Sequence, residues 1–149
     1  MKESQIRTFE DLKCWKACRE LRIFVAKEIV PRLPKHEKYT LSNQILDAAR
    51  STTANIAEGY GRYHYLDNAK FCSNSRGSCW EVLDHLITAY DETFISNELY
   101  LEGRNLVSDA VKLINGYMNY LRRVGSKNEL HDDVSEYITC TQADIYDND

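Results

Sequence analysis

Several features that mark common protein classes are missing from this sequence of 149 residues. No run of apolar residues approaches the roughly 20 that a membrane-spanning helix needs. Residues 1–5 do not resemble a signal peptide, so we expect a cytoplasmic protein with no membrane partner. No segment alternates apolar and polar residues over the length of a strand, which argues against a β-sheet.

The spacings that enzymes and metal sites use are also missing. There is no glycine-rich phosphate loop and no nucleophile paired with a base. None of the four histidines stands at ligand spacing from another histidine or a cysteine. Glu58 and Glu81 are the one conceivable carboxylate pair, and a balancing of structural charges explains them better. We therefore predict a protein that is not an enzyme, with no catalytic residues, metal, cofactor or small-molecule substrate.

Cysteines are odd in number, and prolines are few. The five cysteines include no C-x-x-C pair, and four of them fall on apolar helical rows, so we expect reduced side chains in the core. The two prolines, Pro31 and Pro34, end the first predicted helix. We expect that helix to start at an N-cap, Thr8, and to continue to about residue 30.

Apolar residues recur at helical spacing in four segments. We expect helices at about residues 8–30, 40–58, 65–93 and 97–124. Gly59 is expected to end the second helix in the left-handed conformation and Gly125 to close the fourth, which Ser96 or Asn97 can cap. The four apolar rows are Cys14, Cys18, Leu21, Val25 and Ile29; Leu41, Ile45, Ala48, Thr52 and Ile56; Tyr65, Ala69, Cys72, Arg76, Cys79, Leu83, Leu86, Tyr90 and Phe94; and Leu99, Leu106, Ala110, Leu113, Tyr117, Leu121 and Val124.

Besides its apolar row, the second helix carries a polar row and a row of small residues at positions 49, 53 and 57. Small side chains let another helix approach closely, so this helix is expected to be contacted on several sides. We interpret the polar row as a structural network, with Glu58 paired to Arg62 one turn on; the alternative is a binding site. The predicted network consists of Ser51, Asn55, Glu58 and Glu81.

One charge, Arg76, interrupts the regular apolar row of the third helix. Two interpretations are open. Either the side chain reaches out to solvent, or it is a partly buried charge with a carboxylate partner, Glu58 or Glu81. The neighbouring Gly77 costs about 1 kcal/mol of helix propensity and allows close contact between helices.

Four long amphipathic helices predict an all-α fold, an up-down-up-down four-helix bundle over residues 1–125. Residues 126–149 form an acidic tail that we expect to be flexible, with seven acids and one base, Lys127. The rest of the chain holds 18 bases and 16 acids, a modest indication of a polyanionic partner. The candidates for contact with nucleic acid are Arg50, Arg62, Lys70, Arg76, Arg122 and Arg123.

These residues also carry a resemblance to a known family. The motifs are Phe9-x-Asp11-Leu12-x-x-Trp15-Lys16-Ala17, Leu41-x-x-Gln44-Ile45, Ala48-Ala49-x-Ser51, Asn55-Ile56-Ala57-Glu58-Gly59-x-Gly61-Arg62 and Phe71 with Arg76-Gly77-Ser78-x-x-Glu81. They resemble the S23-like four-helix bundle proteins encoded in intervening sequences of large-subunit ribosomal RNA genes. The accessory variability protein of diversity-generating retroelements is similar. The resemblance covers about residues 6–125.

The resemblance implies a homopentameric barrel of four-helix bundles with no catalytic residues to transfer. The retroelement relative implies, as partners, nucleic acid and a reverse transcriptase. This sequence departs from the family pattern at Asp47, where a basic residue is usual, at residues 51–53, where a Ser-Ile-Pro-like segment is usual, and in its acidic tail. Asp47 and the tail both lower the positive charge that a nucleic-acid binder needs.

Two functions therefore compete. The first is a non-enzymatic, oligomeric adaptor for RNA or a nucleic-acid-processing protein, in which a ring multiplies the affinity of a modest basic patch. The alternative is a protein–protein scaffold with no nucleic-acid binding. A third hypothesis is autoinhibition, in which the acidic tail lies on basic surface and competes with a polyanion.

Overall fold

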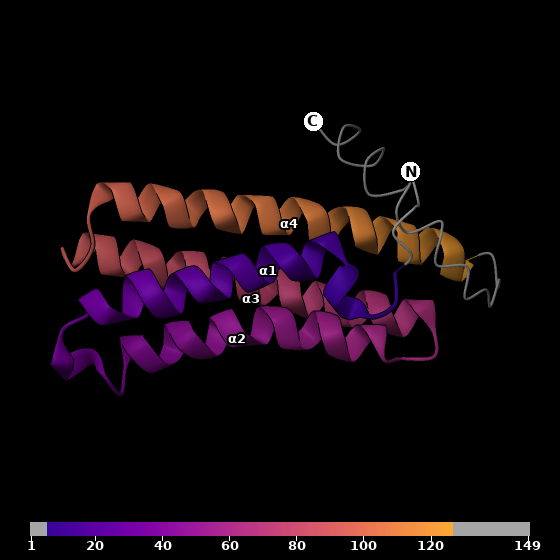
Figure 1. Cartoon of the computed structure of the whole chain (residues 1–149), viewed down its shortest axis with the longest axis horizontal. Helices are drawn as coiled ribbons and strands as arrows, with labels where there is room; N and C mark the ends of the chain where they lie inside the picture. Colours follow the sequence, from indigo (N-terminus) through magenta and orange to yellow (C-terminus); the bar gives the residue numbers. More distant parts are fainter. Residues whose placement is uncertain (1–5, 127–149) are drawn as a thin grey trace.

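The computed structural model describes residues 6–126 of the chain, and over this range it contains four α-helices and no strand. The helices are α1 (Lys13–Phe24), α2 (Leu41–Tyr60), α3 (Tyr65–Asp91) and α4 (Asn97–Ser126). Each packs against its neighbours in the chain, and α1 also packs against α4, which closes the bundle (Figure 1). The prediction of an all-α, up-down-up-down four-helix bundle is confirmed. The acidic segment lies outside the described residues.

The first helix begins later than predicted. Thr8 does cap a helix, but that helix is the single 3-10 turn Phe9–Asp11, after which Leu12 is extended. The Asp11 carboxylate accepts hydrogen bonds from the backbone N–H groups of Arg7 (2.8 Å) and Thr8 (3.4 Å). Both hydrogen bonds lower the pKa of Asp11, and the bond from Arg7 has the larger effect. The side chains of Thr8 and Asp11 form a capping box around this turn. The turn ends at Asp11, and α1 begins as a separate helix at Lys13.

Aromatic contacts hold this short turn against the bundle. The Phe9 ring lies edge-on to Trp15, at 5.3 Å between centroids, and edge-on to Tyr60 of α2, at 6.4 Å. At its other end α1 continues into the π-helical segment Val25–Ile29 and the 3-10 turn Val30–Arg32. Val25 and Ile29 are fully buried, so the predicted apolar row persists although the hydrogen-bond pattern changes. Pro31 lies in that last turn, and the chain is extended again at Leu33.

The centre of the bundle is packed by small and polar groups as well as by large apolar ones. All five residues of the predicted α2 row are buried, and so are Ala49 and Thr53 on the small-residue flank. The predicted close contact of α2 with more than one helix is thus confirmed. Ser75 of α3 donates a hydrogen bond to the carbonyl oxygen of Thr52 at 2.7 Å, and Cys18 Sγ of α1 lies 3.9 Å from the same hydroxyl oxygen.

Gly59 does not terminate α2 in the left-handed conformation, so that prediction was wrong. The helix runs through it to Tyr60, and no glycine among residues 6–126 has a positive φ. Gly59 serves close packing instead. A Cβ atom there would lie 2.7 Å from Asn68 Oδ1 and 2.8 Å from the Cβ of Phe71. The absence of a side chain therefore lets α3 cross close to α2.

The core face of α4 is rotated from the predicted row. Leu106 and Leu113 are only half-buried, whereas Val107 and Ile114 are fully buried. Apolar residues stand in adjacent pairs along this helix, so spacing alone does not choose between the two faces. Ser96 caps the helix, because its Oγ accepts a hydrogen bond from the Leu99 N–H at 3.2 Å. Gly125 does not close the helix, which continues to Ser126.

Four cysteines, Cys14, Cys18, Cys72 and Cys79, are buried with free thiols, as predicted for core residues. Burial raises the pKa of Cys72 from 9.0 to about 12. Burial also raises the pKa of Cys14, and a hydrogen bond with Cys18, followed by burial, raises that of Cys79. Protonated thiols are poor nucleophiles, so Cys14, Cys72 and Cys79 act in packing. The hydrogen bond with Cys79 instead lowers the pKa of the buried Cys18. The fifth, Cys140, lies outside the described residues.

Two glycine substitutions should change stability in opposite directions. Gly59→Ala forces a Cβ against the α3 backbone and should lower the free energy of unfolding by about 1–3 kcal/mol. At Gly77 a Cβ would meet nothing within 4 Å among the described residues, so the close contact between helices predicted there was wrong. Gly77→Ala should therefore raise the free energy of unfolding by about 0.5–1 kcal/mol through helix propensity. Urea titrations of both variants measure the difference, and effects of the same sign would contradict the assigned packing.

The buried thiols predict a loss of stability in alkali. Since the pKa of Cys72 is raised in the folded state, its contribution is complete below pH 9.0 and is lost as the pH rises toward about 12. Each such thiol should cost about 1.4 kcal/mol per pH unit above its unfolded pKa. Cys72→Ala should therefore flatten the decline of unfolding free energy as the pH rises from 9.0 toward about 12. An unchanged slope would show that Cys72 ionises normally in the native bundle.

Candidate nucleic-acid interface

The predicted polar network forms between α2 and α3, with a changed membership. Asn55 Nδ2 donates to both the carbonyl oxygen and the hydroxyl of Ser51, each at 2.9 Å. The Ser51 hydroxyl lies 2.8 Å from that of Ser78 on α3. Ser78 is a member that the sequence analysis did not name. The network satisfies half-buried polar groups and joins two helices, which is a structural role.

The two glutamates of the predicted network have their hydrogen-bond and ion-pair partners elsewhere. Glu58 pairs with Arg62 one turn along at 2.9 Å, as expected. Glu81 lies 3.4 Å from His85 on its own helix. Both carboxylates are more than half exposed, so each pair adds little to stability.

Arg76 is partly buried and reaches α4. Its guanidinium donates to Asn115 Oδ1 at 2.8 Å. The prediction that Arg76 is a partly buried charge with a partner is confirmed. The prediction that this partner is Glu58 or Glu81 was wrong. A neutral amide holds Arg76 in place without neutralising its charge, so the guanidinium stays available for an anion.

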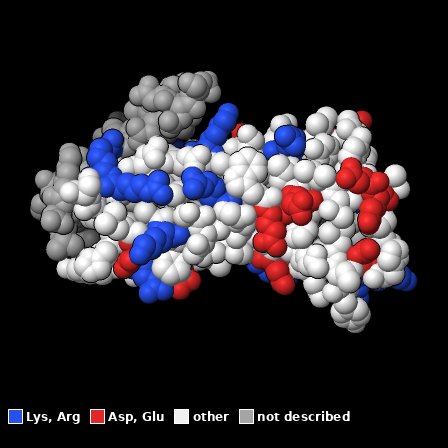
Figure 2. Space-filling model, turned by 180° about the vertical axis from the view of Figure 1, so that it is seen from behind, with Lys and Arg blue, Asp and Glu red and all other residues white. Residues whose placement is uncertain are grey.

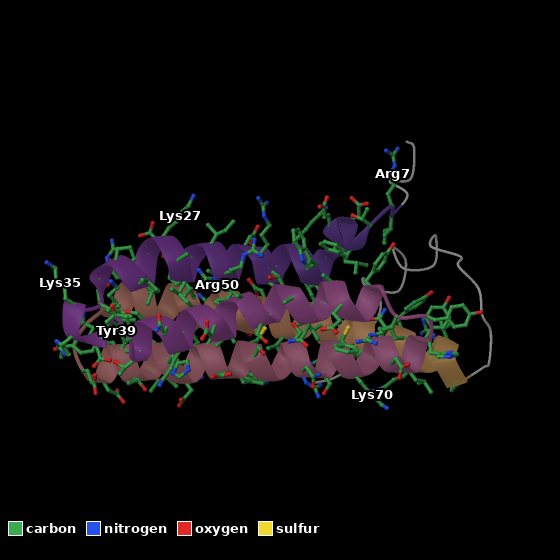
Figure 3. The ribbon with its side chains drawn as sticks, turned by 90° about the horizontal axis from the view of Figure 1, so that it is seen from below. Arg7, Lys27, Lys35, Tyr39, Arg50 and Lys70 are labelled. Carbon is green, nitrogen blue, oxygen red and sulfur yellow. The ribbon has the colours of Figure 1, made fainter. Side chains whose placement is uncertain are left out.

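The other predicted basic residues do not form one patch. Arg50 lies where α1 and α2 run side by side, whereas Lys70 lies at the α3 edge of the bundle (Figure 3). Arg62 stacks over the Phe71 ring at 4.5 Å, and the guanidinium of Arg123 lies 5.9 Å from the centre of the Tyr120 ring. The structure therefore separates Arg50 from the candidates on α3 and α4.

Charge is strongly separated along the hairpin that α3 and α4 form. Its open end, residues 65–80 and 110–126, has a single acid, Asp67. Its closed end, residues 81–109, has seven acids and one base, Arg104. Figure 2 shows Lys and Arg gathered over one half of this side of the molecule and most of the Asp and Glu over the other. We define the basic surface as the five bases of the open end: Lys70, Arg76, Lys112, Arg122 and Arg123.

Lys112 belongs to this surface and was missed by the sequence analysis. Lys112, Asn115, Asn119 and Arg122 follow one another at spacings of three, four and three residues, so they share one face of α4. Asn115 on that face contacts Arg76, which joins the α4 row to α3. The 3-4-3 spacing of polar residues was a signal in the sequence. It was overlooked because the predicted apolar row of α4 is rotated from the core face that the structure shows.

A shallow groove elsewhere offers no comparable site. It has a volume of about 540 Å³, lies beside α1 and has walls of mixed charge. Its walls are formed by Glu10, Asp11, Trp15, Lys16, Arg19 and Glu20. Among the described residues no three His, Cys, Asp or Glu side chains are placed to hold a metal ion.

Comparisons with known proteins identify the family. No helix within residues 6–126 is both long and apolar enough to cross a membrane. No curated protein matches the sequence significantly. A family model described as the 23S rRNA-intervening sequence protein matches residues 10–116, which is most of the described bundle. The chain, with its four-helix bundle, therefore belongs to the 23S rRNA-intervening sequence protein family.

Proposed function

We propose that this protein is a non-enzymatic, oligomeric adaptor that binds RNA through the basic surface of α3 and α4. The observation that carries the proposal is the charge separation of the hairpin, with five bases against one acid at its open end. The family description, which names 23S rRNA, favours RNA as the polyanion.

The geometry of Arg76 suits contact with phosphate. A guanidinium group has five N–H donors, and the bond to Asn115 uses Nη1. The remaining donors can bind phosphate oxygens while Asn115 keeps the group oriented. Asn115 and Asn119 add uncharged donors and acceptors on the same face of α4, and these suit sugar hydroxyls and base edges.

Assembly would compensate for the modest charge of one copy. Several identical surfaces on one particle bind a long polyanion with far higher avidity than one surface does. We propose a homo-oligomer for this reason, and the resemblance described above suggests five copies. A reverse-transcriptase-like protein, as for the retroelement relative, is a further partner within this proposal.

RNA binding should depend on the basic surface and on salt. The triple variant Arg76→Gln, Lys112→Gln, Arg122→Gln should bind structured RNA at least tenfold more weakly in filter-binding titrations. The slope of log affinity against log salt concentration should be smaller in magnitude by about 2 to 3, because three phosphate contacts are lost. The matched control, Lys27→Gln, Lys35→Gln, Arg50→Gln, removes the same charge away from the surface (Figure 3).

Three results would contradict the proposal. They are no binding by the native protein at low salt, affinity that stays flat as salt rises, and an equal loss in the control variant.

A second candidate function is a protein scaffold, and the outward face of α3 favours it. Trp80 is 50% exposed and Leu66 is 51% exposed. Gly77 lies between them on the helix surface, with open space where a Cβ would be. An exposed tryptophan and an exposed leucine beside a glycine suit a flat contact with another protein, including a further copy of this chain.

A substitution at Trp80 tests whether the outward face of α3 is a protein contact, and nuclease treatment separates the two functions. If α3 is a protein contact, Trp80→Asp should lower the mass in solution measured by light scattering, or abolish partners that survive nuclease treatment in a pull-down. The exposed Tyr39→Asp, in the segment before α2 at one end of the bundle (Figure 3), is the control. Partners that disappear with nuclease in the native protein would favour the RNA adaptor over the scaffold.

A further inference from the structure

The described part of the chain ends beside the basic surface. α4 ends at Ser126, three residues after Arg123. The 23 residues that follow hold seven acids and a single base, Lys127. A strongly acidic segment is thus tethered directly to the part of the bundle with the largest excess of positive charge.

Other surfaces near this point offer less attraction. The closed end of the α3–α4 hairpin is acidic and repels the segment. The start of α1, residues 10–20, has three acids and three bases, so the charges there are balanced. Charge complementarity therefore favours the basic surface over both alternatives.

The acidic segment is long enough to cover this surface. Lys112 lies 14 residues before Ser126, about 21 Å along α4 at about 1.5 Å per residue. An extended chain spans about 3.3–3.6 Å per residue. Asp132, Asp133 and Glu136 can therefore reach about 20 to 35 Å from Ser126. This range includes Lys112 and the guanidinium of Arg76, which is bound to Asn115.

Tethering makes a weak contact effective. A short flexible linker gives a docking segment an effective concentration in the millimolar range. Individual exposed ion pairs stabilise little and are screened by salt, so the docked segment would exchange readily. A long RNA with one phosphate per nucleotide can then displace it.

We propose that residues 127–149 dock on the basic surface of their own bundle and compete there with RNA. The docking rests on the charges and the reach given above, whereas the competition also rests on the proposed RNA-binding function. The segment sets a threshold: only a polyanion that contacts several of the five bases at once, or several copies of the surface, displaces it.

Zero-length cross-linking of the full-length protein tests the docking without RNA. A carbodiimide joins carboxylates to lysine amines that touch them. At low salt, peptide mass spectrometry should find acids of residues 127–149 linked to Lys112 and Lys70. Lys27 and Lys35, toward the other end of the bundle (Figure 3), are the matched controls. The links should disappear in about 1 M salt, where the screening length is about 3 Å.

Several cross-linking results would overturn the docking. They are no link to Lys112 or Lys70, links to Lys13 and Lys16 in preference, or equal links to the control lysines. A mixture of isotopically labelled and unlabelled protein shows whether links form within one chain. Links found only between differently labelled chains would also overturn docking on the chain's own bundle.

RNA titrations then test the competition. The variant Asp132→Asn, Asp133→Asn, Glu136→Gln should bind RNA at low salt about three- to tenfold more tightly than the native protein. The control variant Glu81→Gln, Asp84→Asn, Asp91→Asn removes the same charge from the acidic end of the hairpin and should gain less. Equal gains in the two variants would overturn the competition. If no variant binds RNA, the proposed function fails, and the cross-links still decide whether the segment docks.

Discussion

The hydrogen bond from the Ser75 hydroxyl to the carbonyl oxygen of Thr52, 2.7 Å long, fixes how α3 is rotated in the bundle. Ser75 is fully buried, and a buried hydroxyl without a partner costs about 1–3 kcal/mol. One residue further, about 100° around the helix, Arg76 meets Asn115 of α4. The next residue, Gly77, faces open space. One buried hydrogen bond thus determines which side of α3 faces the interior, which side contacts α4 and which side faces outward.

Charge is distributed unevenly along the α3–α4 hairpin, and the rotation of α3 places Arg76 on its basic surface. Positive charge collects where α3 begins and α4 ends, and negative charge collects where the two helices join. A net charge of −4 for the whole chain hides this separation. The bundle has a local field that attracts a polyanion at one end and repels it at the other. The same field acts on the chain's own acidic segment, so the proposed RNA binding and the proposed self-docking both depend on one surface.

Periodicity predicted much of the fold because it reports which face of a helix is buried. The rows of α1 and α2 are buried as expected, and the Glu58–Arg62 pair follows from helical spacing alone. Periodicity was right only in part on α4. Ala110, Tyr117 and Leu121 of the predicted row are buried, but adjacent apolar pairs such as Leu106 and Val107 allow two faces. Periodicity failed at Thr8, because local spacing does not show that Asp11 folds back to close a single turn.

The candidate site was harder to predict because its parts come from different helices. Arg76 was recognised as unusual, but its partner is a neutral asparagine 39 residues away in the sequence, and charge arguments searched only for carboxylates. Gly59 resembled a helix terminator because both a terminator and a close crossing require the absence of a side chain. Lys112 becomes visible as part of the surface only when the rotation of α4 is known.

The central claim is that RNA meets the bundle where Arg76 and Asn115 join α3 to α4. The most direct measurement is the side-chain amide NMR spectrum of asparagines in labelled full-length protein during addition of RNA. The account predicts that the Asn115 and Asn119 signals shift together, while the signal of Asn43, exposed on α2, stays in place. Shifts at Asn43 with unmoved signals from Asn115 and Asn119 would contradict it.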